Sequence, residues 1–196
     1  GRRQGVADSG LPSAHPLIVA NIFSQLGTNW RTLAQSMPAN CFKQNSGAYV
    51  ARHNPATYYT NLGGACESRD IPLPSKPDLS AKFTLIVPDN SHNGHDVSIG
   101  TADDWVKSYL PKVLDSAEYR AGKTAVFVFF DEGNGSGDVE TNVSMFVLSP
   151  STPTSARDAT RLTHYSTLRA TEEMLGLGLL GGAATANDLR AGFNLN

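Results

Sequence analysis

Hydrophobic residues in the second half of the chain fall into short runs with the spacing of strands. Residues 83–87 are rich in β-branched side chains and are followed by Pro88, which predicts a strand that runs into a loop. Residues 124–130 are apolar on both faces of a strand, the pattern of a central parallel strand that helices cover on each side. A further strand is expected over residues 143–148.

Three other segments have helical features. Residues 17–26 carry apolar side chains near helical spacing. Thr101 opens a capping box, with an acidic residue three positions later. The inward-facing stripe of that helix is expected at Trp105, Tyr109, Val113 and Leu114. Residues 166–175 are expected to form a helix capped by Ser166. The order strand, helix, strand, strand, helix predicts an α/β fold.

The composition of the chain shifts at one place, the proline-rich segment 71–77. Its prolines lack backbone donors and restrict the residues before them, which excludes a helix or a central strand there. The segment is therefore interpreted as a surface crossing. With 196 residues and no internal repeat, the chain is expected to form a single domain over residues 1–196.

The charge of the chain is nearly balanced, with 16 Lys and Arg against 18 Asp and Glu. This balance lacks the basic footprint of proteins that bind phosphate backbones, so no nucleic-acid partner is expected. No apolar run approaches the roughly 20 residues that cross a bilayer, so no transmembrane segment is expected. The sequence begins with Gly1 and shows no intact signal peptide, so we expect its start to have been processed, cloned or cut.

The two cysteines, Cys41 and Cys66, lie in polar, loop-like sequence without the second Cys or His pair of a zinc site. Two buried free thiols are one interpretation. A disulfide is favoured, because free thiols in loops would be exposed and reactive. A disulfide in turn favours a secreted, extracellular protein.

Asp131 and Glu132 directly follow the apolar run 124–130. A bare carboxylate at the mouth of a dry sheet is costly, and a divalent cation would relieve that cost. Oxygen ligands suit Mg²⁺, Ca²⁺ or Mn²⁺, and a nearby histidine would admit Zn²⁺ or Fe, so the metal is not identified. An acidic turn in solvent is the alternative interpretation.

Histidines supply the other candidate chemistry. His95 lies in the densest polar cluster of the chain, residues 89–96, which fails as a calcium loop because Gly100 stands where a bidentate Glu is required. His53 follows a cation and precedes an Asn-Pro turn, a pairing that suits an anionic substrate. His164 stands just before a predicted helix. Each of these histidines also has a purely structural interpretation, as part of a polar turn or a helix cap.

Several common signatures are missing from the sequence. Residues 133–137 lack the last glycine of a dinucleotide fingerprint, and no nucleophile elbow, Walker A loop or H-E-x-x-H motif occurs.

A set of short motifs resembles the bacterial phosphoesterase family that contains acid phosphatases and phospholipases C. In order, they are Ser36-Met37-Pro38, Cys41, Arg52-His53-Asn54-Pro55, Cys66, Val87-Pro88-Asp89, Gly94-His95-Asp96, Asp104-Trp105, Asp131-Glu132-Gly133, His164-Tyr165-Ser166, Thr171-Glu172 and Leu175-Gly176. The resemblance covers residues 23–186. It implies the alkaline phosphatase-like fold, a three-layer α/β/α sandwich with a mostly parallel central sheet.

The resemblance also implies a mechanism. A Ser or Thr nucleophile beside a divalent metal ion is transiently phosphorylated, with Asp131 and Glu132 as metal ligands and His53, His95 and His164 as catalytic residues. The substrate is then a phosphate ester or a phospholipid head group. Family members begin with a strand bearing a Glu-Asn pair and then the nucleophile, and neither is found here. We therefore expect the chain to be the later part of a larger enzyme, with the N-terminal segment absent.

Two other interpretations stay open at this point. One is a non-catalytic binding fragment or pseudoenzyme of the same fold. The other is an unrelated secreted hydrolase that uses His95 and Asp131 as a base pair.

Overall fold

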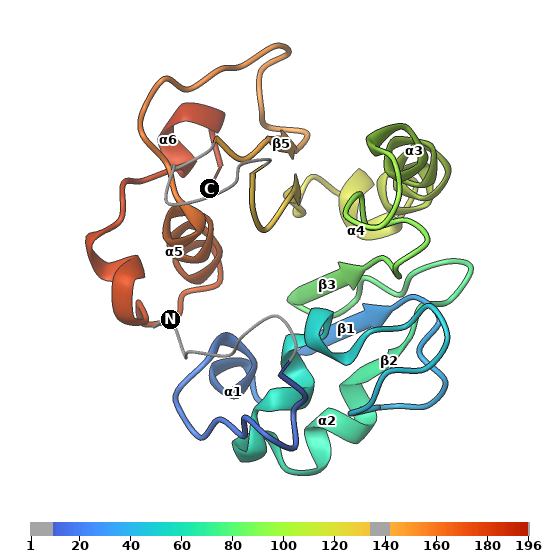
Figure 1. Ribbon diagram of the computed structural model, residues 1–196. Helices are drawn as coiled ribbons and strands as arrows, with labels where there is room; N and C mark the ends of the chain where they lie inside the picture. Colours follow the sequence, from blue (N-terminus) through green and yellow to red (C-terminus); the bar gives the residue numbers. More distant parts are fainter. Residues whose placement is uncertain (1–9, 134–141, 196) are drawn as a thin grey trace. The chain divides into compact units, whose positions relative to one another are not determined.

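The structure is a computed structural model that describes residues 10–133 and 142–195 (Figure 1). These residues form two compact units, an N-terminal unit up to Ser116 and a C-terminal unit from Ala117 onward. Most of the glycine-rich segment 133–137 lies outside the described residues. No described helix is long and apolar enough to cross a membrane.

The N-terminal unit contains a small parallel sheet and several short helices. Its elements are α1 (Ile22–Leu26), β1 (Trp30–Ala34), η1 (Ala51–His53), η2 (Pro55–Tyr58), η3 (Thr60–Leu62), α2 (Gly64–Arg69), β2 (Asp70–Pro72), β3 (Phe83–Val87) and α3 (Ile99–Leu114). The predicted strand at residues 83–87 is confirmed as β3. Helix α1 is shorter than predicted, because Asn21 caps it and Leu17 instead forms a bridge with Tyr59.

The sheet has the order β2-β1-β3, and both pairings are parallel. The central strand β1 was not predicted, although Trp30 and Leu33 within it are fully buried. Strand β2 begins the proline-rich segment and stands at the edge of the sheet. This position agrees with the prediction that the prolines exclude a central strand.

One face of the sheet packs against α1 and α2. The core there contains Phe23, Trp30 and Phe83, with Phe23 and Trp30 ring centroids 4.7 Å apart. The predicted disulfide is confirmed: Cys41 and Cys66 are bonded, with Cα atoms 5.4 Å apart. Cys66 lies on α2 rather than in a loop, and the bond joins that helix to the segment after β1.

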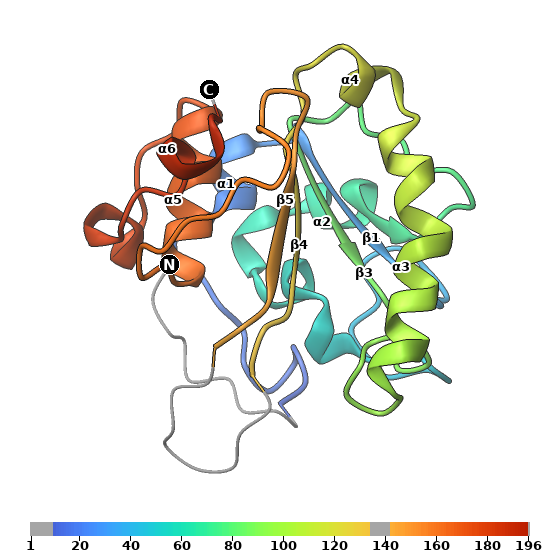
Figure 2. The same ribbon diagram turned by 90° about the horizontal axis from the view of Figure 1, so that it is seen from above.

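Helix α3 lies along the other side of the sheet (Figure 2). It begins earlier than predicted, because Ser98 rather than Thr101 is its cap, accepting the Thr101 N–H at 3.1 Å. Tyr109 and Val113 of the predicted stripe are buried. The Trp105 ring is stacked on Tyr109, with centroids 5.4 Å apart.

The C-terminal unit consists of α4 (Ala117–Arg120), β4 (Val126–Phe129), β5 (Met145–Leu148), α5 (His164–Met174), η4 (Gly181–Thr185) and α6 (Arg190–Phe193). Strand β4 pairs with β5 in antiparallel orientation, which corrects the prediction of a parallel strand at residues 124–130. Helix α5 begins at His164, two residues before the predicted cap, because Thr163 and Ser166 form the capping box.

The two faces of the β4–β5 pair differ. Phe127 and Val147 pack with Ala170 and Leu189 in the core of the unit. Phe146 lies on the opposite face and is exposed, and Phe129, on the same face as Phe127 at the end of β4, is exposed as well. The continuous apolar pattern of β4 therefore does not correspond to burial along its whole length. Together the two units establish an α/β protein with a small parallel sheet, while the three-layer sandwich stays a prediction.

Candidate functional site

A connected polar cluster lies at the carboxyl ends of β1 and β3. Ser36 lies two residues after β1 with a left-handed backbone, φ 57°. Its hydroxyl donates to Asp89 Oδ2 at 2.5 Å, and Asp89, two residues after β3, is 4% exposed. Parallel strands bring their carboxyl ends to one edge of a sheet, where α/β proteins commonly bind ligands.

His92 is held in this cluster by two acceptors. Its Nδ1 lies 3.1 Å from Gln35 Oε1 and 3.1 Å from Asp89 Oδ1. Because both partners accept, Nδ1 carries the proton and Nε2 of the neutral ring keeps its lone pair. The His92 ring is also stacked on Trp105, with centroids 6.1 Å apart. Its orientation is therefore fixed from two sides.

The predicted site residue His95 lies three positions further along the same loop and is 70% exposed. The side-chain oxygen of Asn93 accepts the His95 and Asp96 N–H groups at 2.9 and 3.1 Å, which shapes the turn. Hydrogen bonding from Asn93, with the charges of His95 and Arg52, holds the pKa of Asp96 below its usual range.

His53 is the last residue of η1, and its N–H donates to Val50 O at 3.1 Å. The His53 segment and the His95 loop lie side by side in the N-terminal unit. The Asn90 N–H donates to Ala48 O at 3.0 Å, and Tyr49 and Ala51 pack in one cluster with Val87 of β3. The structure thus brings two of the predicted histidines to the carboxyl end of one sheet.

The other predicted residues meet in the C-terminal unit. Asp131 and Glu132 come two and three residues after the end of β4, close to the predicted position, and both are exposed. His164 is the first residue of α5, and its Nε2 lies 2.7 Å from the backbone oxygen of Asp131. Nε2 must donate in that bond, so Nδ1 keeps the lone pair of the neutral ring.

The exposure of Asp131 and Glu132 changes the case for a metal. The predicted desolvation cost does not apply to carboxylates in water, so the metal expectation rests on their ligand chemistry and on the family resemblance. That chemistry fits a hard divalent cation, which prefers oxygen ligands. Within the described ranges, the group of three close ligand-type side chains is Cys41, Cys66 and Asp70. Its two sulfur atoms are already joined in the disulfide.

Sequence reasoning missed Gln35, His92 and Trp105. The signal for His92 was present, because it lies in the predicted polar cluster, but nothing in the sequence distinguishes it from His95. Gln35 is far from that cluster in sequence and reaches it through the pairing of β1 with β3, while Trp105 comes shortly after the cluster and stacks on His92 from α3.

Two known proteins are similar to most of this chain. No protein-family model matches the chain. Over 187 residues the chain is 27% identical to a probable acid phosphatase of Kluyveromyces lactis, covering 85% of this chain and 44% of that protein. Over 179 residues it is 25% identical to a phosphate-repressible acid phosphatase of Penicillium chrysogenum, covering 83% of this chain and 43% of that protein. The chain thus spans less than half the length of these relatives.

Proposed function

We propose that the natural protein containing this sequence hydrolyses phosphoric esters as an acid phosphatase. The observation that carries the proposal is the similarity to two proteins named acid phosphatases over more than four fifths of the chain. The cluster at the carboxyl ends of β1 and β3 supports it, because imidazoles there can contact an anionic ester.

The proposed roles follow from the placement of each histidine. Exposed His95 is free to protonate the leaving oxygen, a step that general acids accelerate by about 10²- to 10⁴-fold. His53, beside Arg52, contributes to a positive environment for the phosphoryl oxygens. His92 is too firmly held by Gln35, Asp89 and Trp105 to swing toward substrate, so it positions the loop that carries His95. His164, the first residue of α5, is proposed as a third catalytic residue.

Asp131 and Glu132 are proposed to hold a divalent metal ion. Such an ion neutralises phosphoryl oxygens and lowers the pKa of a nucleophile. The contact between His164 and the Asp131 backbone fixes the turn that presents both carboxylates. Because both side chains are exposed, they can take up the ion without rearranging a buried core.

A phosphate monoester is the proposed substrate, since the similar proteins are named phosphatases. The Ser or Thr that accepts the phosphoryl group is assigned by the family resemblance to sequence outside these 196 residues. The disulfide is consistent with a secreted protein, which is proposed on that ground.

The experiment is hydrolysis of p-nitrophenyl phosphate by the natural protein, with p-nitrophenylphosphorylcholine as the matched diester substrate. We expect the monoester to be cleaved, chelator to abolish turnover, and added divalent metal to restore it. Preferential cleavage of the diester would contradict the phosphatase assignment. Turnover that survives complete chelation would remove the metal from the mechanism.

The nucleophile has its own test. Acid quenching during turnover traps a phosphorylated enzyme, and peptide mapping then locates the modified residue. A phosphorylated Ser or Thr within these 196 residues would contradict its assignment to another segment.

A further inference from the structure

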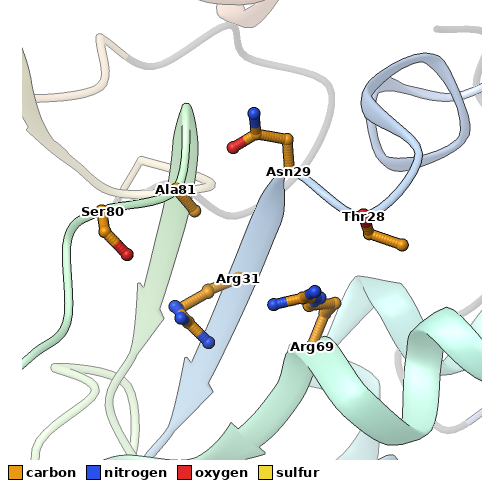
Figure 3. A pocket seen from close by; sticks show the side chains of 6 residues that line it. All are labelled: Thr28, Asn29, Arg31, Arg69, Ser80 and Ala81. Atoms are coloured by element: carbon orange, nitrogen blue, oxygen red, sulfur yellow. The ribbon is translucent and has the colours of Figure 1, made fainter.

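A polar cavity lies at the amino ends of β1 and β3, the end of the sheet opposite to Ser36 and Asp89. Its volume is about 260 Å³. Its lining residues are Thr28, Asn29, Arg31, Arg69, Ser80 and Ala81 (Figure 3). None of them belongs to the cluster around His53 and His95.

Two arginines reach this cavity, Arg31 from β1 and Arg69 from the C-terminal end of α2, just before β2. Thr32 of β1 is the parallel register partner of Asp70 of β2, so Arg31 and Arg69 stand one position earlier on adjacent segments. Figure 3 shows both guanidinium groups beside β1, with Thr28 on one side and Ser80 on the other. The pairing of Thr32 with Asp70 thus brings the two preceding positions near each other, and two permanent positive charges in proximity are unfavourable unless an anion lies near.

The balancing charge at the cavity is incomplete. Arg31 donates to Asp78, whose pKa is lowered by hydrogen bonds from Ser80 and by the charge of Arg31. Arg69 makes no ion pair with any residue in the described part of the chain. Among residues 10–133 and 142–195, the charge of Arg69 therefore has no ion-pair partner.

The hydrogen-bonding capacity of both arginines is also incomplete. The Nε atoms of Arg31 and Arg69 are buried, and no atom of the residues that the structure describes accepts a hydrogen bond from them. An unsatisfied buried donor costs about 1 to 3 kcal/mol, so native structures seldom leave one without a reason. Both guanidinium groups therefore line one cavity with hydrogen-bonding capacity that the described residues do not fill.

We propose that this cavity binds a tetrahedral oxyanion, either orthophosphate or the terminal phosphoryl group of a phosphate ester, between Arg31 and Arg69. The planar fork of an arginine matches two phosphate oxygens at once. The hydroxyl of Thr28 lies at the cavity and supplies a further donor. The inference does not depend on the proposed hydrolysis, because it concerns the other end of the sheet.

The two arginines contribute unequally. Asp78 competes with the ligand for Arg31, whereas Arg69 has no such competitor among the described residues. Loss of Arg69 therefore weakens phosphate binding more than loss of Arg31. This order distinguishes a built site from general attraction of anions to a basic surface, which would respond equally to either change.

The test is a phosphate titration followed by nuclear magnetic resonance of the arginine Nε–H groups, at constant ionic strength and with chelator present throughout. Chelator removes binding at a metal-dependent catalytic site, so the result is independent of the proposed function. We expect the Arg31 and Arg69 signals to shift together along one saturable curve. Arg69→Gln should weaken binding about tenfold or more, and Arg31→Gln less.

Two further variants complete the test. Arg157→Gln removes the same charge from an exposed position in the C-terminal unit and should leave phosphate affinity unchanged. Arg69→Lys keeps the positive charge but loses the planar guanidinium group, so it should still weaken phosphate binding. This variant replaces Arg69→Gln in the test if Arg69→Gln does not fold. Absence of a saturable shift at either Nε, or an equal shift with chloride at matched ionic strength, would overturn the proposal.

Discussion

The side-chain nitrogen of Asn54 donates to both carboxylate oxygens of Asp70, at 2.9 Å each, in the interior of the N-terminal unit. Both side chains are fully buried. Asn54 directly follows His53, so the bond ties one candidate catalytic residue to the first residue of β2. The backbone oxygen of Asp70 also accepts the Cys41 N–H at 3.0 Å.

This relationship predicts a pH-dependent stability. Burial raises the pKa of Asp70 from 3.8 to about 7, with the Asn54 hydrogen bond opposing the rise and the charge of Glu67 adding to it. The folded state therefore binds this proton more tightly than the unfolded chain. Protonation of Asp70 therefore contributes to the free energy of unfolding. This contribution is fully present below about pH 4, is lost as the pH rises through 7, and amounts to roughly 4 kcal/mol at most.

Asp70→Asn removes the titration while keeping the shape of the side chain. Urea unfolding, followed by the fluorescence of buried Trp30, measures the free energy of unfolding from pH 4 to 8.5. We expect the wild type to lose stability relative to Asp70→Asn as pH rises. A difference between the two proteins that stays constant over this range would show that Asp70 has an ordinary pKa.

The disulfide predicts a second stability effect. The bond between Cys41 and Cys66 spans 25 positions of sequence, and closing a loop of this length restricts the unfolded chain by about 3 kcal/mol. Replacing both cysteines with serine should lower the urea concentration at which the N-terminal unit is half unfolded. Reductant should lower this midpoint in the wild type and leave it unchanged in the double variant. Identical midpoints for wild type and variant without reductant would mean that the bond contributes little.

Glu172 predicts a contrast between two substitutions in the C-terminal unit. This side chain is fully buried, its Oε2 accepts the Leu180 N–H at 3.1 Å, and burial raises its pKa. Glu172→Gln keeps an acceptor without a charge and should leave the unfolding free energy at pH 7 unchanged or higher. Glu172→Ala should lower it by about 1 to 3 kcal/mol, because the Leu180 N–H loses its partner. Equal effects of both substitutions would contradict this role.

Features that depend on residues close together in sequence were easier to predict than the pairing of strands. The strand at residues 83–87, the disulfide and the position of Asp131 after a strand all followed from local signals, namely β-branched runs, proline stops and the cost of exposed thiols. Strand β1 was missed because Arg31 and Thr32 interrupt its apolar pattern. Their side chains are accommodated by neighbours distant in sequence, such as Asp78 for Arg31.

The same limit applies to the candidate site. Histidines could be nominated from the sequence, but their order of importance could not. His92 and His95 differ only in what surrounds them: His92 is held by Gln35 from the β1 side and by Trp105 from α3, while His95 is exposed. Likewise, the apolar run ending at Phe130 predicted a strand but not that β5 would pair with it in antiparallel orientation.

The proposed metal site is tested by binding. Asp131→Asn in the natural protein should sharply lower the metal content after equilibrium dialysis against a limiting divalent ion, because a charged oxygen ligand is replaced by a neutral amide. Asp103→Asn, an exposed carboxylate on α3, serves as the matched control and should retain the wild-type content. Equal metal content in all three proteins would remove Asp131 from the site.

The most direct test of the central claim is the value of kcat/KM for p-nitrophenyl phosphate in three histidine variants of the natural protein. His53→Gln and His95→Gln should lower it by about 10²-fold or more, with melting temperatures close to that of the wild type. His15→Gln, in a loop of the same unit but outside the cluster, should leave it unchanged. Wild-type kcat/KM in both His53→Gln and His95→Gln would contradict a phosphatase site at the carboxyl end of this sheet.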